Sequence, residues 1–360
     1  MKKIFFMVCL LVACIANAQT SSKKISVIAY YDGNAAGIDA YPVEKLTHII
    51  FSFCHLKGNE LNVDKMADTL TIQHLVELKQ RNPLLKIILS LGGWGGCQPC
   101  SEVFSTKKGR KEFARSVKHL NEYFKTDGID IDWEYPAIAG YPDHQYMPSD
   151  KKNFTALMQQ LRKELGNKYE ISFAAGGFKT FLDASVEWKK VERYVDKVNL
   201  MSYDLVNGNS TVTGHHTPLY STPQQIESAD NAVHYFDSIH FPLNKVVIGA
   251  AMYGRIFNVN NDAENGLYQP GSFDHGISWR NFDQQAMEQQ GYVHYWDDTA
   301  KASYMYNKTD KKLFTYDDER SMGLKTKYAV DKGLNGIMFW QLGDDKPTAG
   351  LLDAIDNALH

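Results

Sequence analysis

Four carboxyl side chains lie close together in the sequence, at Asp127, Asp130, Asp132 and Glu134. Because side chains alternate between the two faces of a strand, the last three would share one face, and the apolar residues between them would share the other. Three carboxyl groups at this spacing cannot all ionise cheaply, so we expect at least one to keep its proton near neutral pH. A protonated carboxyl beside ionised ones is what a general acid requires. The pattern therefore predicts acid–base catalysis rather than a solvated acidic edge strand, with Asp127, off that face, in a structural role.

The elements that must position these acids follow a regular alternation along the chain. Short apolar runs predict strands over residues 25–31, 46–53, 85–91, 129–134, 169–175, 195–203, 245–253 and 335–342. Helical periodicity fills most of the intervals, over residues 70–81, 108–124, 151–165, 223–238 and 321–332. Repeated β/α alternation in a chain of this size predicts an α/β fold of the (β/α)8 TIM-barrel type. Functional residues of such barrels gather at the carboxyl ends of the strands, and Glu134, Tyr203 and Trp340 occupy such ends.

The interval between the seventh and eighth strands is too long for a simple connection. A structureless loop of that length would be improbable in a compact domain. Residues 256–317 are rich in Tyr, Trp, Asn, Asp and Gly and contain strand-like pieces. We therefore predict a small α+β insertion there, within a catalytic barrel that spans residues 19–360. Such an insertion would stand beside the cleft and deepen it into a groove.

The N-terminus has the organisation of a signal peptide. Two lysines precede an apolar run over residues 4–15, and Ala16-Asn-Ala18 is an A-x-A cleavage site. This predicts a secreted protein cleaved after Ala18, with residues 1–18 removed. The apolar run is too short to span a bilayer. Residues 11–14 also resemble a lipoprotein cleavage box, so an anchor at Cys14 stays open as the alternative.

The composition limits the classes of molecule that this chain is expected to bind. The formal charge of −3 gives no reason to expect nucleic acid or an anionic membrane as partner. No metal-ligand spacing is present, so we expect no metal and no cofactor. We also expect a monomer. With 20 Tyr and 6 Trp, the chain has many flat rings with polar edges, which suit a sugar-binding cleft although most will lie in the core.

Three cysteines follow the predicted cleavage site. Cys97 and Cys100 frame a Gln-Pro pair in a glycine-rich stretch, which in an exported protein favours a disulfide that closes a small loop. Reactive thiols are the alternative, although the flanking sequence lacks a thioredoxin-like context. Cys54 is expected to be a small core residue.

Five segments in chain order resemble the signature motifs of glycoside hydrolase family 18, the retaining chitinases. They are Ser90-Leu-Gly-Gly-Trp94, the acidic stretch 127–134, Met201-Ser-Tyr-Asp204, Met252-Tyr-Gly-Arg255 and Gly336-Ile-Met-Phe-Trp340. Each falls on a different expected strand, and together they cover nearly the whole chain after the signal peptide. The long insertion further resembles the branch of this family in which an extra α/β domain walls the substrate groove.

The resemblance implies a mechanism. Glu134 would protonate the glycosidic oxygen, and the substrate's own acetamide oxygen would attack the anomeric carbon, an exception to the two-carboxylate retaining scheme. Asp132 would orient the acetamide and balance the charge of the oxazolinium intermediate. Asp130 would share a proton and help set the pKa of the Asp132/Glu134 pair. Tyr203 would hydrogen-bond the acetamide carbonyl. Water would then open the intermediate, with Glu134 as base.

Other residues are expected to bind the substrate, by the same resemblance or by their position at a strand end. They are Met201, Asp204, Arg255, Trp340, Tyr30, Phe53 and Trp94. Trp340 would form the floor under the reacting sugar, and Arg255 would reach substrate from the end of the seventh strand. Core packing is an equal alternative for Tyr30 and Phe53. Trp94 is either a subsite platform or loop packing, and its exposure distinguishes the two. The sequence after the fifth strand, residues 174–178, departs from the family pattern and leaves the floor there undefined.

Three functions are compatible with these motifs. The first is a secreted chitinase that cleaves chains of β-1,4-linked N-acetylglucosamine, with chitin or chito-oligosaccharides as partner. The second is an endo-β-N-acetylglucosaminidase that cuts the chitobiose core of N-glycans. The third is a non-catalytic chitin-binding lectin on the same barrel, a class that typically lacks the acid. The presence of Glu134 with both supporting aspartates favours an enzyme.

Overall fold

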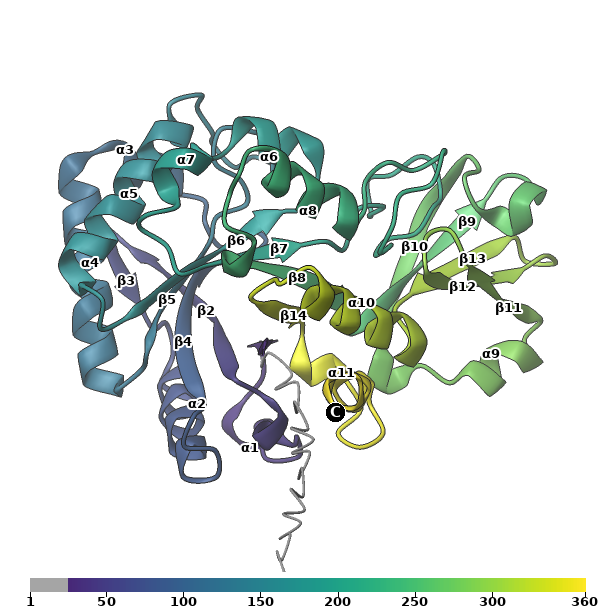
Figure 1. Ribbon diagram of the computed structural model, residues 1–360, viewed down its shortest axis with the longest axis horizontal. Coiled ribbons are helices and arrows are strands. Elements are labelled where there is room, and N and C mark those ends of the chain that lie inside the picture. The colour runs from purple at the N-terminus through teal and green to yellow at the C-terminus, as the bar shows by residue number, and fades with distance from the viewer. Residues whose placement is uncertain (1–24) are drawn as a thin grey trace, which may run out of the picture.

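Parallel strands close into a barrel in the computed structural model, which describes residues 25–360 (Figure 1). The order around the barrel is β1-β14-β8-β7-β6-β5-β4-β2, and the pairing of β1 with β2 closes it. The strands are β1 (Ser26–Tyr31), β2 (His48–Lys57), β4 (Lys86–Gly92), β5 (Gly128–Asp132), β6 (Glu170–Gly176), β7 (Lys197–Met201), β8 (Val246–Ala251) and β14 (Gly336–Trp340). The eight-stranded barrel predicted from the sequence is thus confirmed. The predicted signal peptide and Cys14 lie outside the described residues.

Helices cover the outside of the barrel. They are α1 (Ala35–Ile38), α2 (Met66–Glu77), α3 (Cys100–Ser105), α4 (Lys107–Phe124), α5 (Asp150–Leu165), α6 (Lys179–Ala184), α7 (Trp188–Val191), α8 (Ala229–Ser238), α10 (Glu319–Asp331) and α11 (Leu351–Leu359). The helix expected from residue 223 begins only at Ala229, because the Ser228 side chain accepts a hydrogen bond from the Asn231 N–H and caps it there. Helix α11 was not predicted from the sequence.

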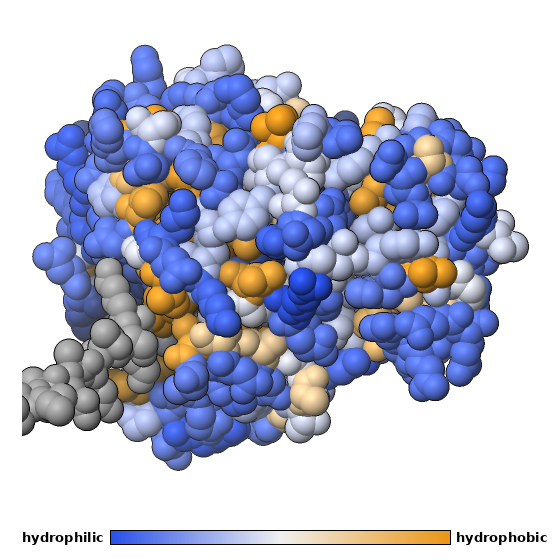
Figure 2. All heavy atoms as spheres, turned by 45° about the vertical axis from the view of Figure 1, so that its right-hand side comes forward, coloured by the Kyte–Doolittle hydropathy of each residue, from blue (hydrophilic) through white to orange (hydrophobic). Residues whose placement is uncertain are grey.

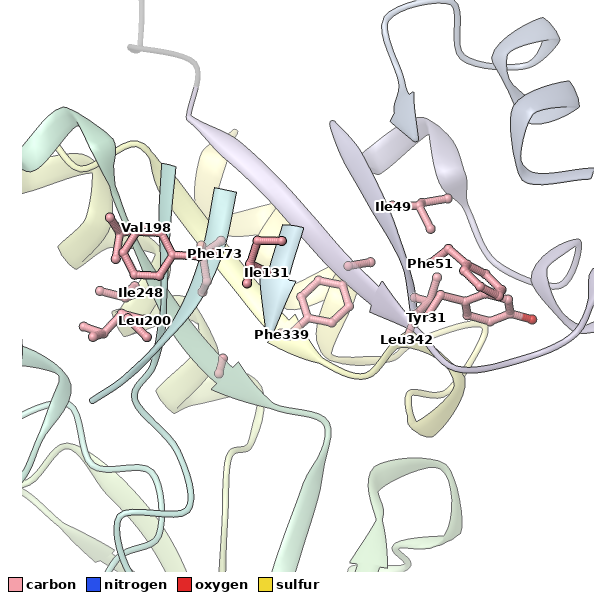
Figure 3. Packing of buried hydrophobic residues seen from close by; sticks show 14 of the residues in the cluster. Tyr31, Ile49, Phe51, Ile131, Phe173, Val198, Leu200, Ile248, Phe339 and Leu342 are labelled. Carbon is pink, nitrogen blue, oxygen red and sulfur yellow. The ribbon is translucent and has the colours of Figure 1, made fainter. Parts of the chain in front are cut away.

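The alternation of side chains along the barrel strands separates two cores. Outward-facing residues such as Ile129 and Ile131 belong to the large apolar cluster between the strands and the helices. Figure 3 shows Ile131 in this cluster with Phe173 and Phe339 from other strands. The inside of the barrel holds a smaller cluster, Ile28, Tyr30, Ile50, Ile88, Val247 and Met338. The predicted register of the acidic strand is therefore confirmed, because its apolar residues pack outward and its acids face inward.

An ion cluster around the buried Glu170 lies at the amino-terminal end of the barrel. Glu170 at the start of β6 lies 2.6 Å from the Lys197 ammonium, 2.8 Å from the Lys86 ammonium and 3.3 Å from the His48 ring. Burial alone would raise the pKa of Glu170, but these partners outweigh it and hold that pKa well below its usual range. Charges at this end of a barrel serve stability rather than chemistry.

The insertion after β8 is a separate antiparallel sheet with the strand order β10-β9-β13-β12-β11, at the right of Figure 1. Its elements are β9 (Tyr253–Val259), β10 (Gly271–Ser278), α9 (Gln284–Gln289), β11 (Tyr292–Asp297), β12 (Ala302–Asn307) and β13 (Lys312–Tyr316). Only Met252 separates β8 from β9, so the sheet continues directly from a barrel strand. Hydrophilic residues cover most of the face shown in Figure 2, and hydrophobic ones are scattered in small groups.

A buried ion pair joins the far end of the insertion to the barrel. The Lys325 ammonium on α10 lies 2.6 Å from Asp317, which follows β13 directly, and also donates to the Thr217 carbonyl at 2.8 Å. Asp317 in turn accepts a hydrogen bond from the Ala251 N–H at the end of β8. Lys325 is fully buried. The insertion is therefore fixed to the barrel at both its entry and its exit.

Candidate active site

Asp130 lies inside the barrel with every acceptor position engaged. Its Oδ1 accepts hydrogen bonds from Ser172 at 2.6 Å and Asn199 at 3.1 Å, and its Oδ2 from Ser90 at 2.9 Å and Tyr30 at 3.1 Å. Burial raises the pKa of Asp130, and these hydrogen bonds offset part of that rise. Because two carboxylate oxygens can accept about four hydrogen bonds, the surroundings suit the ionised form. Asp130 is thus a fixed acceptor at the base of the site.

Asp132 is the next inward-facing residue on β5, and it is only 4% exposed. Its Oδ1 is buried and has no hydrogen-bond partner among residues 25–360. Burial raises the pKa of Asp132 well above its usual value, and the charges of Glu134 and Asp130 raise it further. A buried carboxyl oxygen without a partner is costly, so Asp132 is poised to receive a proton or a hydrogen-bond donor.

Glu134 lies just beyond the carboxyl end of β5 and is 8% exposed. The pKa of Glu134 is raised to about 7, mainly by burial. The neighbouring Tyr135 lowers this pKa, and the charge of Asp204 raises it. A carboxylic acid with this pKa carries a proton in a large fraction of molecules near neutral pH. It can therefore donate that proton as a general acid and take one back as a base.

Asp204 and Arg255 form a paired contact beside these acids. Arg255 Nε donates to Asp204 Oδ1 and Nη2 donates to Oδ2, both at 2.5 Å. The His216 ring is buried behind them, with Nδ1 3.5 Å from Asp204 Oδ1. Burial would raise the pKa of Asp204, but His216 and Arg255 outweigh it and hold that pKa well below its usual range. Asp204 is therefore a fixed negative charge.

The position of Arg255 differs from the sequence-based expectation. It lies on β9, the first strand of the insertion, rather than at the end of the seventh barrel strand. Its guanidinium lies over the rings of Tyr253 and Phe273, 5.3 Å from each centroid. Cation–π contacts and the ion pair together orient the side chain.

Trp340 is the last residue of β14 and packs against other aromatic rings. Phe53 stacks against it with centroids 5.6 Å apart, and Tyr30 packs at 6.0 Å. Tyr30 is 1% exposed, and its hydroxyl donates to Asp130. The structure therefore places Tyr30 behind the carboxylates rather than on a surface that substrate could touch, because its ring is covered and its hydroxyl is engaged. Phe53 is half-buried beneath Trp340.

Tyr203 and Met201 complete this side of the site. Both are partly buried against the small cluster inside the barrel, as is Trp340. Burial raises the pKa of Tyr203 well above its usual value, and Tyr253, Asp132 and Glu134 add to the rise. Tyr203 is therefore a neutral phenol that can donate a hydrogen bond beside the acids.

Trp94 extends from the loop after β4 and is 53% exposed. This exposure is what a platform would show rather than a ring packed inside its loop. Cys97 and Cys100 form a disulfide in the same loop, as predicted, and Cys54 is a buried free thiol. The loop after β6, where the sequence departs from the family pattern, places Phe178 against Tyr135 at 5.5 Å.

Three residues at the site were not singled out from the sequence. Tyr135 follows Glu134 and lowers its pKa, Tyr141 contacts Trp94, and His216 lies behind Asp204. The adjacency of Tyr135 to the acid was a usable signal. Tyr141 is far from Trp94 in sequence, and His216 lies in the same irregular connection after β7 as Asp204, where no periodicity indicates the contact.

No group of three or more potential ligands that could hold a metal ion is present in the described part of the chain. Within that same part, no helix is long and apolar enough to cross a membrane.

An (β/α)8 barrel with buried acids at its strand ends and an insertion beside them is the architecture of a glycoside hydrolase. Residues 26–345 match the sequence profile of Glycosyl hydrolases family 18, and the chain belongs to this family. The family resemblance read from the five motifs is thus confirmed.

Curated relatives agree with this assignment. Chitinase A1 of Niallia circulans is 34% identical over 323 aligned positions, which cover 79% of this chain and 46% of that protein. The chain thus spans about half the length of that relative. Chitotriosidase-1 of Mus musculus is 30% identical over 329 positions, covering 83% of this chain and 67% of that protein. These similarities place the chain among chitinase-type glycoside hydrolases.

A solved structure extends the comparison to the whole fold. The family 18 N-acetylglucosaminidase from Paenibacillus barengoltzii is 35% identical to this chain, with a TM-score of 0.84. The match covers 93% of this chain and 100% of that one.

Proposed function

We propose that this protein is an exported chitinase that hydrolyses β-1,4-linked N-acetylglucosamine chains by substrate-assisted, retaining catalysis. One observation carries the proposal. The buried Oδ1 of Asp132 has no partner within residues 25–360, and it lies between the hydrogen-bonded Asp130 and the acid Glu134. A substrate acetamide N–H would supply the missing hydrogen-bond partner, and the acetamide oxygen would supply the nucleophile.

The proposed first step is cleavage of the glycosidic bond. Glu134 gives its proton to the glycosidic oxygen, and the bond from that oxygen to the anomeric carbon breaks. The acetamide carbonyl oxygen forms a new bond to the same carbon and yields an oxazolinium ion. Asp132 in its ionised form accepts the acetamide N–H and balances the positive charge. Tyr203 donates to the acetamide oxygen and holds it in line.

The second step returns the enzyme to its starting state. Glu134, now ionised, takes a proton from water, and the resulting hydroxide opens the oxazolinium at the anomeric carbon. The acetamide is restored, and the new hydroxyl has the configuration of the bond that was broken. A pKa of about 7 suits a group that acts as acid and then as base.

The binding surface supports a sugar with an apolar face. Trp340 would pack against the face of the reacting N-acetylglucosamine, and Asp204 and Arg255 would contact hydroxyls beside it. Export rests on the signal-peptide pattern of residues 1–18 and remains a proposal, with lipid anchoring at Cys14 as its alternative.

A second candidate has a specific observation in its favour. The Paenibacillus structure, all of which matches 93% of this chain, is described as an N-acetylglucosaminidase. Release of single N-acetylglucosamine units from chain ends would use the same acids and the same intermediate. The two activities differ in their products rather than in their chemistry.

The product profile on chitohexaose, set beside a high-mannose glycoprotein, tests these alternatives. A chitinase gives chitobiose and longer fragments, an N-acetylglucosaminidase gives the monosaccharide first, and an enzyme of the N-glycan core releases the glycan from the glycoprotein. Glu134→Gln is the matched control and should abolish every product while retaining oligosaccharide binding. Turnover by this variant would contradict the assignment of Glu134. Equal cleavage of fully deacetylated chitosan would contradict substrate assistance.

A further inference from the structure

Three cations line an open hollow at the junction of the insertion and the barrel. The hollow has a volume of about 310 Å³, and the residues that line it are Lys301, Arg320, Gly323, Leu324 and Lys327. Lys301 lies in the turn between β11 and β12, and the other four lie on α10, which Figure 1 shows between the barrel and the insertion. None of these five residues belongs to the candidate active site.

Arg320 is held beside this hollow by an aromatic ring of the insertion. Its guanidinium carbon lies 3.8 Å from the centroid of the Trp296 ring. Trp296 is on β11, and its indole N–H donates a hydrogen bond to Asp298 at 3.3 Å. A guanidinium that lies over a ring uses its flat face for that contact, so the N–H groups at its edge stay available. Arg320 is therefore an oriented hydrogen-bond donor.

The cations around the hollow are only partly balanced by acids. Lys301 pairs with Asp298 at 2.7 Å. Among residues 25–360, neither Arg320 nor Lys327 has a carboxylate oxygen within 4 Å. Two exposed lysines on other helices do have such a partner, an acid four residues further along. In a chain with a formal charge of −3, this local excess of positive charge attracts anions.

Gly323 leaves room between the cations. Arg320 and Lys327 are seven residues apart, so they lie on one face of α10, about 10 Å apart along the helix axis. Gly323 lies between them in the sequence, and an added Cβ there would meet no atom within 4 Å. A glycine inside a helix is destabilising relative to alanine. Here it keeps open the space that the cations surround.

We propose that Lys301, Arg320 and Lys327 form a binding site for a tetrahedral oxyanion, a sulfate or phosphate group. A guanidinium donates two parallel hydrogen bonds to such a group, and the two ammonium groups add charge on side chains long enough to converge on an ion between them. The group is either a free inorganic ion or an ester on a polyanionic chain, since the hollow is open to solvent. The inference goes beyond the proposed function, because none of these residues takes part in the hydrolysis.

Calorimetric titration of the purified protein at constant ionic strength tests this site, with sodium sulfate and dextran sulfate as separate probes. Arg320→Gln/Lys327→Gln should weaken binding about tenfold or more. Gly323→Leu keeps every charge but fills the hollow, and should weaken binding by a similar factor while melting no lower than wild type.

The matched control is Lys108→Gln/Arg115→Gln on α4. It removes the same charge at the same seven-residue spacing from exposed positions of another helix. Binding of either probe should change less than about twofold in this variant, because screening at constant ionic strength leaves little effect of distant charges. Melting temperatures report whether each variant folds.

The two probes identify the source of the anion. If dextran sulfate binds more tightly than sodium sulfate and the site variants lose this binding, the site takes an ester group on a polyanionic chain. If sodium sulfate binds as tightly and is lost in the same variants, the site takes the free ion, and the proposal stands in both cases. Equal losses in the α4 control would indicate diffuse attraction and overturn the site. Full binding by Gly323→Leu, or no binding of either probe to wild type, would also overturn it.

Discussion

Arg255 and Asp204 are joined through two hydrogen bonds although one belongs to the insertion and the other to the loop after β7. Arg255 keeps Asp204 ionised beside Glu134, and the negative charge of Asp204 contributes to the raised pKa of the acid. The insertion therefore does more than border the cleft, since it supplies the cation that keeps Asp204 in place.

Removing the charge of Asp204 should move the alkaline limit of activity. The general acid acts only while protonated, so kcat/KM is expected to fall as pH rises through the pKa of Glu134, about 7 in the free enzyme. Asp204→Asn removes a nearby like charge, which lowers that pKa and shifts the limit to more acid pH by about half a unit to one unit. The pH profile of kcat/KM on chitohexaose measures the shift. An unmoved limit with a lower plateau would mean that Asp204 serves binding alone.

Asp132→Asn should lower kcat on chitin oligosaccharides by about a hundredfold or more, because an amide cannot balance the charge of the oxazolinium intermediate. The buried site should tolerate the change, since the two side chains have nearly the same shape. Steady-state kinetics on chitin oligosaccharides measures the loss of kcat. Thermal unfolding of the variant is the control for an intact fold. Retained kcat would show that Asp132 only supports the strand.

The acid also has a cost in stability that depends on pH. The folded-state pKa of Glu134, about 7, is above the ordinary value of 4.5. A raised folded pKa contributes stability that is fully present below pH 4.5 and is lost as pH rises to about 7. Glu134→Gln removes this dependence. The variant should therefore melt at a higher temperature than wild type at about pH 8 and at a similar one at about pH 4. If Glu134→Gln melted at a higher temperature than wild type only at acid pH, the pH dependence would have the opposite sign. That result would contradict a pKa of Glu134 raised by burial.

Lys325→Met should destabilise the protein strongly, because it leaves the buried Asp317 without its cation. Breaking such a pair costs about 3–5 kcal/mol. Chemical denaturation measures the loss. The double variant Lys325→Met/Asp317→Asn should recover part of it, since no unpaired charge remains buried. A single variant as stable as wild type would show that the pair contributes nothing at this junction.

The strands and the acids could be predicted because their patterns are local. Alternation places Asp130 and Asp132 on one face whatever surrounds them, and the apolar runs identify the barrel strands. The environment of each acid could not be predicted. The four donors to Asp130 come from β1, β4, β6 and β7, so only the closed barrel assembles them.

Other residues could not be placed from the sequence for the same reason, because their contacts form only in the folded chain. For Tyr30, substrate contact and core packing were equal alternatives, and the structure supports core packing because its hydroxyl donates to Asp130 and its ring packs against Trp340. Tyr141 escaped notice because its loop has no periodicity, and its contact with Trp94 spans two separate connections. Helix α11 was missed although its buried residues Leu351, Leu352 and Ile355 follow helical spacing.

The passage from β8 to β9 through Met252 alone has a consequence for how the groove can work. Domain closure needs a few flexible residues that absorb a change in backbone angles. Here the entry is a nearly uninterrupted run of paired backbone, and the exit is tied down by Lys325 and Asp317. The insertion is therefore held at both ends in the position that the folded chain gives it. The proposed substrate would meet a wall that these two connections fix beside the barrel.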